Sequence, residues 1–178
     1  MHLPVTYWQY IFRIYKRNTM PTQQQITLMR RAISLATENV RSGRGGPFGA
    51  LIVRDSEIIA EAANAVTTTN DPTAHAEVCA IRLACRKLQG YSLSGCAIYT
   101  SCEPCPMCLA AIYWAHLDAI YYGNTSAEAA RADFDDAFLY RELAAPREAR
   151  KIPSEQLLAE EACASFEAWQ HSPIKIKY

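Results

Sequence analysis

The stretch of sequence that decides the fold is CAIYTSCEPCPMCLAAIYWAHLDAIYYGN, residues 96–124. It opens with a β-type run (96–100), continues into an apolar helical segment with prolines in its first turn (104–116), and closes with a second β-type run (118–124). A strand, a helix and a strand of these lengths predict a right-handed parallel crossover, because parallel neighbours need a long connection. The stretch therefore indicates an α/β fold.

The same stretch contains three cysteines whose chemistry has to be identified. Cys102, Cys105 and Cys108 are spaced by three, and a proline stands on either side of Cys105. This spacing fits a thioredoxin-like redox pair, a structural zinc site closed by Cys102, or half of a catalytic metal site. The stretch alone leaves the three alternatives open.

Upstream of this stretch, the pattern predicts a helix followed by a hairpin. The helix covers residues 23–42, with Thr22 as its N-cap and Gly43 at its end. Two β-type runs, 48–55 and 57–64, are separated by a short turn and predict a hairpin. The apolar face of the helix is expected at Ile26, Met29, Ile33, Ala36 and Val40.

A second helix is predicted in residues 74–90, AHAEVCAIRLACRKLQG, after the polar loop TTTNDPT. Thr73 is expected to cap it and Gly90 to end it. We expect this helix and the helix at 104–116 to follow neighbouring parallel strands, which would place the N-terminal ends of the two helices side by side. The apolar face of this helix is expected at Val78, Ile81, Cys85 and Leu88.

Metal-ligand side chains fall at both of these helix starts. His75 opens one helix, and Cys105 and Cys108 share one face of the first turn of the other, where the helix dipole favours thiolates. One His and two Cys give zinc three protein ligands, which is the count of a catalytic site that keeps a fourth position for water. Glu77, two residues from His75, is placed to act as general acid and base for that water.

Length and composition restrict the setting. The chain has 178 residues, of which half are hydrophobic and a fifth are charged, which fits one globular domain. It contains no membrane-length apolar run and no secretory signal pattern, so we expect a cytoplasmic protein without membrane association. Seven cysteines, irregularly spaced, favour reduced thiols or metal ligands over a disulfide framework.

The first nineteen residues differ from the rest. Residues 1–19 contain Arg13, Lys16 and Arg17, no acid and many aromatic residues. We interpret this segment as an extension created by an upstream start codon, with a membrane-surface or targeting role as the alternative. The single domain is then residues 20–178, with fifteen basic and eighteen acidic residues, which weighs against nucleic-acid binding.

Several motifs together resemble a known family. HAE at 75–77, followed by PCPMC at 104–108, is the H-x-E and P-C-x-x-C pattern of zinc-dependent base and nucleoside deaminases. GGPFGALIV, NDPTAHAE, YTSCEPCPMCLAAIYWA and the later FDD resemble bacterial guanine deaminases of the cytidine-deaminase-like fold. The resemblance runs from the first helix to the C-terminus, is weakest over 144–165 and excludes 1–19. It implies a three-layer α/β/α sandwich with a mixed central sheet and a zinc site at two helix N-termini.

The resemblance also implies roles for individual residues. It makes His75, Cys105 and Cys108 the ligands of one Zn²⁺ per subunit and Glu77 the general acid and base. Asp136, in FDD, would pair with the guanine edge and help to move protons. The residues implied to bind the purine are Phe48, Asn64, Ala76, Trp114 and Tyr178.

By this resemblance the protein is a guanine deaminase that converts guanine to xanthine and ammonia. The family is an intertwined homodimer, which implies that residues 153–178 exchange between subunits and that Tyr178 caps the partner's purine pocket. This chain departs from its relatives at IPSEQLLAEEACASFEAW (152–169), where they look more strand-like. A tRNA adenosine deaminase shares HAE and PCxxC but needs a basic surface. A redox pair or a non-catalytic zinc module would leave HAE at the second helix start unexplained.

Overall fold

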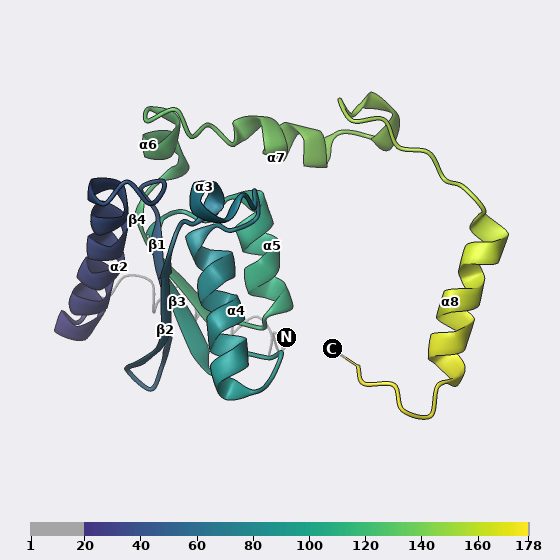
Figure 1. Ribbon diagram of the computed structural model, residues 1–178, viewed down its shortest axis with the longest axis horizontal. Coiled ribbons are helices and arrows are strands. Elements are labelled where there is room, and N and C mark those ends of the chain that lie inside the picture. The colour runs from purple at the N-terminus through teal and green to yellow at the C-terminus, as the bar shows by residue number, and fades with distance from the viewer. Residues whose placement is uncertain (1–19, 178) are drawn as a thin grey trace, which may run out of the picture.

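The computed structural model describes residues 20–177, and at its centre lies a four-stranded mixed sheet (Figure 1). The strand order is β2-β1-β3-β4. β1 pairs antiparallel with both β2 and β3, whereas β3 and β4 are parallel, which confirms the parallel pairing expected from residues 96–124. The strands are β1 (Gly49–Arg54), β2 (Glu57–Ala63), β3 (Cys96–Cys102) and β4 (Ala119–Asn124).

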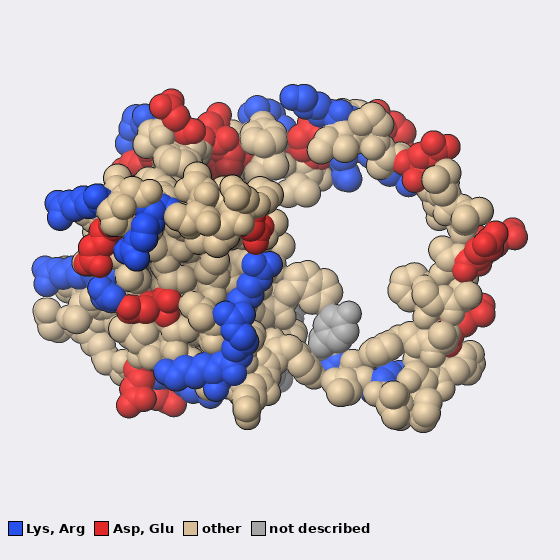
Figure 2. Space-filling model, viewed as in Figure 1, with Lys and Arg blue, Asp and Glu red and all other residues tan. Residues whose placement is uncertain are grey.

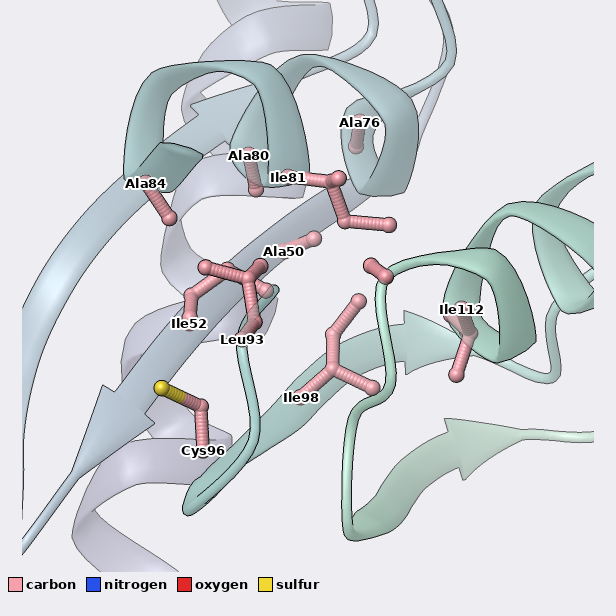
Figure 3. Close-up of a cluster of buried hydrophobic side chains, with 11 residues drawn as sticks. Ala50, Ile52, Ala76, Ala80, Ile81, Ala84, Leu93, Cys96, Ile98 and Ile112 are labelled. Carbon is pink, nitrogen blue, oxygen red and sulfur yellow. The ribbon is translucent and has the colours of Figure 1, made fainter. Parts of the chain in front are cut away.

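Helices cover both faces of this sheet, so the three-layer α/β/α expectation is confirmed. Helix α2 (Gln23–Arg41) packs on one face, and α4 (Ala76–Leu88) and α5 (Pro106–Trp114) lie on the other (Figure 1). Alternate residues of β1 divide between the two sides because side chains alternate along a strand. Ala50 and Ile52 join the cluster under α4 and α5, which Figure 3 shows, whereas Leu51 and Val53 join the cluster under α2.

Helix α2 begins where the sequence predicts it, but of its expected apolar face only Ala36 is fully buried. Thr22 and Gln25 form a capping box, yet Ile33 and Val40 are 45% and 50% exposed. The cause is the close approach of α2 to the start of β1, since a Cβ at Gly49 would lie 2.5 Å from the carbonyl oxygen of Ala32. Only small side chains fit along that line. The buried residues of α2 are Leu28, Ala32, Ala36 and Asn39.

The N-terminal end of α4 also differs from the expectation. Thr73 does not cap the helix, because its hydroxyl donates to Asp71 Oδ1 at 2.7 Å, and His75 itself is the N-cap residue. The other end is Gln89, in the left-handed conformation with φ of 52°, rather than Gly90. A short helix, α3 (Val66–Thr69), lies in the loop that precedes α4 and was not predicted.

The expectation that the two helices follow neighbouring parallel strands is wrong. β1 lies between β2, which precedes α4 in the chain, and β3, which precedes α5. The helix starts still meet, because α4 crosses over β2 and β1 and packs against α5. Because β1 separates β2 from β3, α4 lies over β1 as well as β2 where it reaches α5.

Residues 20–124 are here called the body. Residues 125–177, here called the arm, extend away from it. The arm runs outward in an arc (Figure 1) and none of its described residues is buried. Its end returns to the body, where the Tyr91 hydroxyl donates to the Lys177 carbonyl oxygen at 2.9 Å. No helix within residues 20–177 has the length and apolar character needed to cross a membrane. The arm contains α6 (Ser126–Ala130), α7 (Ala137–Ala144), the 3₁₀ turn η2 (Arg147–Ala149) and α8 (Ala159–His171).

Candidate active site

The three predicted metal ligands converge at the starts of α4 and α5. His75 and Cys105 are the N-cap residues of the two helices, both with extended backbone, and Pro106 at the first helical position fixes the entry of α5. The His75 Nδ1 atom lies 3.6 Å from Cys105 Sγ and 3.4 Å from Cys108 Sγ. All three ligand atoms lie within 4.8 Å of one another, so one ion can contact them all.

The electrostatics of this cluster suit a soft divalent cation. A hydrogen bond from the Cys108 thiol, helped by the His75 imidazole, lowers the pKa of Cys105 to about 4. The same Cys105–Cys108 hydrogen bond raises the pKa of Cys108. Contact with Cys105 raises the pKa of His75. Two sulfur donors and one imidazole nitrogen match the ligands that zinc prefers, and binding would displace the proton shared by the thiols.

Cys102 does not complete a closed four-ligand site. Its thiol is buried and donates to the Thr125 carbonyl oxygen at 3.7 Å, outside the group formed by His75, Cys105 and Cys108. Burial raises the pKa of Cys102 to about 11. The described residues thus offer three ligands, the number typical of a catalytic zinc site.

Glu77 lies buried in the first turn of α4, two residues after His75, with 4% of its surface exposed. Thr100, from the middle sheet strand β3, donates from Oγ1 to Glu77 Oε1 at 3.2 Å. Burial raises the pKa of Glu77, so this carboxyl group takes up a proton more readily than an exposed one. A buried carboxyl group of this kind beside a metal site can carry a proton between water and a substrate.

Two of the predicted purine-binding residues, Phe48 and Asn64, contact each other. Asn64, 8% exposed, donates its backbone N–H to the Phe48 carbonyl oxygen at 3.0 Å. Its side-chain Oδ1 accepts from the backbone N–H of Val66 at 3.3 Å, which orients the amide group. Phe48 in turn makes an edge-to-face contact with Phe134, with ring centroids 4.9 Å apart. The arrangement gives an aromatic wall beside an oriented amide.

Ala76 lies in the first turn of α4, and Asp136 lies at the start of α7. Ala76 is fully buried between His75 and Glu77 in the first turn of α4, where helix N–H groups have no partner within the helix. Asp136 is the N-cap residue of α7. Burial and then the negative charge of Cys105 raise the pKa of Asp136, which brings this arm residue into electrostatic range of the metal ligands.

Trp114 lies at the opposite end of α5 from Cys105. Trp114 is the last residue of α5, 69% exposed, about 13 Å along the helix from Cys105. A role in closing the pocket of its own subunit is therefore not supported by this position. Tyr178 lies outside the described residues, as does the whole of 1–19.

Two residues at the site were missed by sequence reasoning. Thr100, fully buried, hydrogen-bonds Glu77 across 23 positions of sequence, and no local pattern connects them. Phe134 stands directly before Asp135 and Asp136 in the FDD tripeptide, which was the available signal. Its contact with Phe48 is set by how the chain turns after α6.

Comparison with known proteins identifies the family to which this chain belongs. Residues 22–124 match the family described as the cytidine and deoxycytidylate deaminase zinc-binding region. The chain is 54% identical over 152 residues to a guanine deaminase of Bacillus subtilis (strain 168), covering 85% of this chain and 97% of that protein. The X-ray structure of guanine deaminase from Bacillus subtilis superposes with a TM-score of 0.84 over the same shares of the two chains.

A more distant relative matches over a shorter stretch. A tRNA-specific adenosine deaminase of Aquifex aeolicus (strain VF5) is 45% identical over 76 residues, which is 43% of this chain and 50% of that protein. The match to the family covers residues 22–124, which is all but the first two residues of the body, and includes all three metal ligands. The chain belongs to the zinc-dependent cytidine and deoxycytidylate deaminase family.

Proposed function

We propose that this protein catalyses the hydrolytic deamination of guanine to xanthine and ammonia, with one zinc ion bound by His75, Cys105 and Cys108. The observation that carries the proposal is the joint placement of these ligands and the buried Glu77 beside Phe48 and Asn64. The identity of 54% to a guanine deaminase, along nearly its full length, supports guanine as the base. The reaction needs one water and no redox partner.

The chemistry divides between the ion and the side chains. Zinc bound at such a site lowers the pKa of a water molecule toward ~7 and so supplies a nucleophile at neutral pH. Glu77 would accept a proton from that water and pass it to the ring nitrogen next to C2, while the new C–O bond forms at C2. Asp136 would assist transfer of the proton of the new C2 hydroxyl to the amino group, so that the C2–N bond breaks, the C2 carbonyl of xanthine forms and ammonia leaves.

The remaining residues hold the purine. Phe48 and Phe134 offer an aromatic wall for the flat ring, and Asn64 offers its side-chain amide to the ring edge. The buried Thr100 hydroxyl fixes the Glu77 carboxyl group where proton transfer takes place. This division of contacts fixes the orientation of the base before water attacks.

A substrate panel tests the proposal. Ammonia release should be measured with guanine, guanosine, adenine, cytosine and a tRNA anticodon stem, with the zinc-loaded protein in each case. We expect guanine to be the best substrate by a wide margin. A preference for the tRNA stem or for cytosine would contradict the assignment, and absence of turnover with every substrate would favour a non-catalytic zinc module.

The tRNA alternative rests on the partial match to tRNA-specific adenosine deaminases and on one surface feature. Figure 2 shows a basic band over α4, whose basic residues are Arg82, Arg86 and Lys87. Acidic and basic residues are otherwise mixed on this face, and Arg82 pairs with Asp71. A duplex-binding surface needs a broader excess of positive charge, so free guanine is favoured.

The domain organisation is part of the same proposal. We propose that residues 20–178 form one deaminase domain, that 1–19 are an extension outside it, and that the protein acts in the cytoplasm as a homodimer exchanging residues 153–178. The position of Lys177 supports exchange. It contacts Tyr91 beyond the C-terminal end of α4, about 20 Å along that helix from His75. A tail held there does not reach its own site, so Tyr178 would cap the site of the partner.

A further inference from the structure

The buried face of α2 includes one polar side chain, Asn39, which is 3% exposed in the last turn of the helix. Its Nδ2 group donates two hydrogen bonds, to the carbonyl oxygen of Gly46 at 3.0 Å and to that of Asn64 at 2.8 Å. A buried amide group that donates to two carbonyl oxygens holds both in place, and without it the buried carbonyl oxygen of Asn64 would lose its donor. Asn39 therefore joins α2 to two separate loops.

Both loops carry the residues proposed to bind the purine. Gly46 accepts a hydrogen bond from the backbone N–H of Phe48 at 2.8 Å, and Phe48 accepts one from Asn64 at 3.0 Å. The amide of Asn39 closes this chain of contacts into a ring, from Gly46 through Phe48 to Asn64. The aromatic wall and the oriented amide are thus fixed relative to each other by one side chain of α2.

The ring is packed too closely to tolerate a shift. A Cβ at Gly45 would lie 2.5 Å from the Asn64 carbonyl oxygen and 2.9 Å from Asn39 Nδ2. Gly45 is needed here for space, since its backbone is not in the left-handed region. The loop therefore passes so close to Asn39 and Asn64 that a side chain at position 45 would not fit.

We propose that Asn39 is a positioning residue for the purine pocket, acting through Phe48 and Asn64. The inference rests on the proposed guanine deamination for its substrate. Removing the Asn39 amide takes away its hydrogen bonds to the carbonyl oxygens of Gly46 and Asn64. The aromatic wall and the Asn64 side-chain amide are then no longer held in a fixed relative position. The metal ligands on α4 and α5 are not bonded to this ring, so zinc binding and proton transfer stay intact.

The test compares Asn39→Ala and the isosteric Asn39→Asp with Thr37→Ala, an exposed position on the same helix whose hydroxyl bonds only Ile33 of α2. We expect the KM for guanine to rise about tenfold in both Asn39 variants, because ground-state and transition-state binding are lost together. The kcat and the zinc content should stay within about threefold of the wild type. Thr37→Ala should behave as the wild type.

A double-variant cycle separates positioning from general destabilisation. In an Asn64→Ala background, Asn39→Ala should raise KM by much less than tenfold, because the group through which it acts is gone. Additive effects in the cycle, or a loss confined to kcat, would overturn the proposal. An unchanged KM in Asn39→Asp would do the same.

Hydrogen exchange gives a readout that does not need the substrate. The amides of Phe48 and Asn64 should exchange at least about tenfold faster in Asn39→Ala than in the wild type, while those of Ile52 and Val53 stay unchanged. Unchanged exchange at Phe48 and Asn64 would refute the role of Asn39. Failure of the wild type to deaminate guanine would instead refute the proposed function, and the exchange experiment would still decide the role of Asn39.

Discussion

The body and the arm differ in how completely each buries its own apolar residues. Every buried side chain of the described structure lies in the body, between Leu28 and Ala115. The arm has comparable apolar residues but exposes them, with Phe166 at 71% and Trp169 at 43%. The body coincides with the part of the chain that matches the deaminase family. The comparison teaches that the metal site is built by a self-sufficient unit, whereas the arm needs a surface that its own body does not offer.

The proposed catalytic residues divide along the same boundary. The metal ligands and Glu77 belong to the body, and Asp136 belongs to the arm. Figure 2 shows open space between the body and much of the arm in this view. If a second copy of the chain supplies the surface that the arm packs on, a substitution in the body should affect the site of its own subunit. The effect of a change in the arm should then depend on whether the two copies assemble.

The largest effect is expected from removing a metal ligand in the body. Cys105→Ser should reduce zinc well below one ion per chain and abolish ammonia release, because the thiolate is the ligand with the lowered pKa. The melting temperature should fall as well, since metal binding stabilises only the folded state. Cys163→Ser, at an exposed position of the arm, is the matched control and should retain zinc and activity. Full zinc occupancy in Cys105→Ser would remove Cys105 from the site.

Glu77→Gln should come next, with roughly 10³-fold lower kcat, because an amide cannot transfer the proton. Zinc content and melting temperature should match the wild type, since Gln keeps the shape of the buried side chain. Glu167→Gln, on exposed α8, is the control in the arm and should have no effect on turnover. Retained activity in Glu77→Gln would reduce Glu77 to a structural residue.

Core substitutions measure the difference in burial directly. Ile98→Ala, at a fully buried position of β3, should lower the free energy of unfolding by about 2–5 kcal/mol through the cavity it leaves. Ile152→Ala, at a 79% exposed position of the arm, should change it by less than about 0.5 kcal/mol. Denaturant unfolding followed by tryptophan fluorescence checks both. Equal costs would mean that Ile152 is covered in solution.

Deleting parts of the arm tests where its surface lies. Removal of residues 174–178 should leave a folded, zinc-loaded protein whose guanine turnover falls about tenfold or more, because water is no longer excluded from the site. Removal of everything after Pro153 should also convert the proposed dimer to a monomer in light scattering. Full activity after the short deletion would show that the tail does not cover the site, and a stable dimer after the long one would rule out exchange.

The smallest effect is expected at the other end of the chain. A protein beginning at Met20 should match the full chain in melting temperature and in guanine turnover, within experimental error. The described body begins with the capping box of Thr22 and Gln25, which is complete without the preceding residues. A large loss of stability or activity would show that residues 1–19 belong to the domain.

The sequence by itself determined the elements and the chemistry of the metal site. The N-cap at Thr22, the hairpin turn near Asp55 and the crossover over residues 96–124 are local features, and each was found where the pattern placed it. The ligands were predictable because His75, Cys105 and Cys108 occupy helix starts, where a short motif specifies both side chain and backbone. The same motifs predicted the zinc deaminase family, and the family match over residues 22–124 confirms it.

Only the tertiary structure decided how these elements meet. Close contact between Gly49 and the backbone at Ala32 selected the buried face of α2, and so brought Asn39 rather than Val40 inward. The strand order placed β1 between β2 and β3, and it brought Thr100 to Glu77 across 23 positions of sequence. These features depend on the close approach of backbones that are distant in sequence and on pairings between distant strands, for which a local pattern of residue types holds no information.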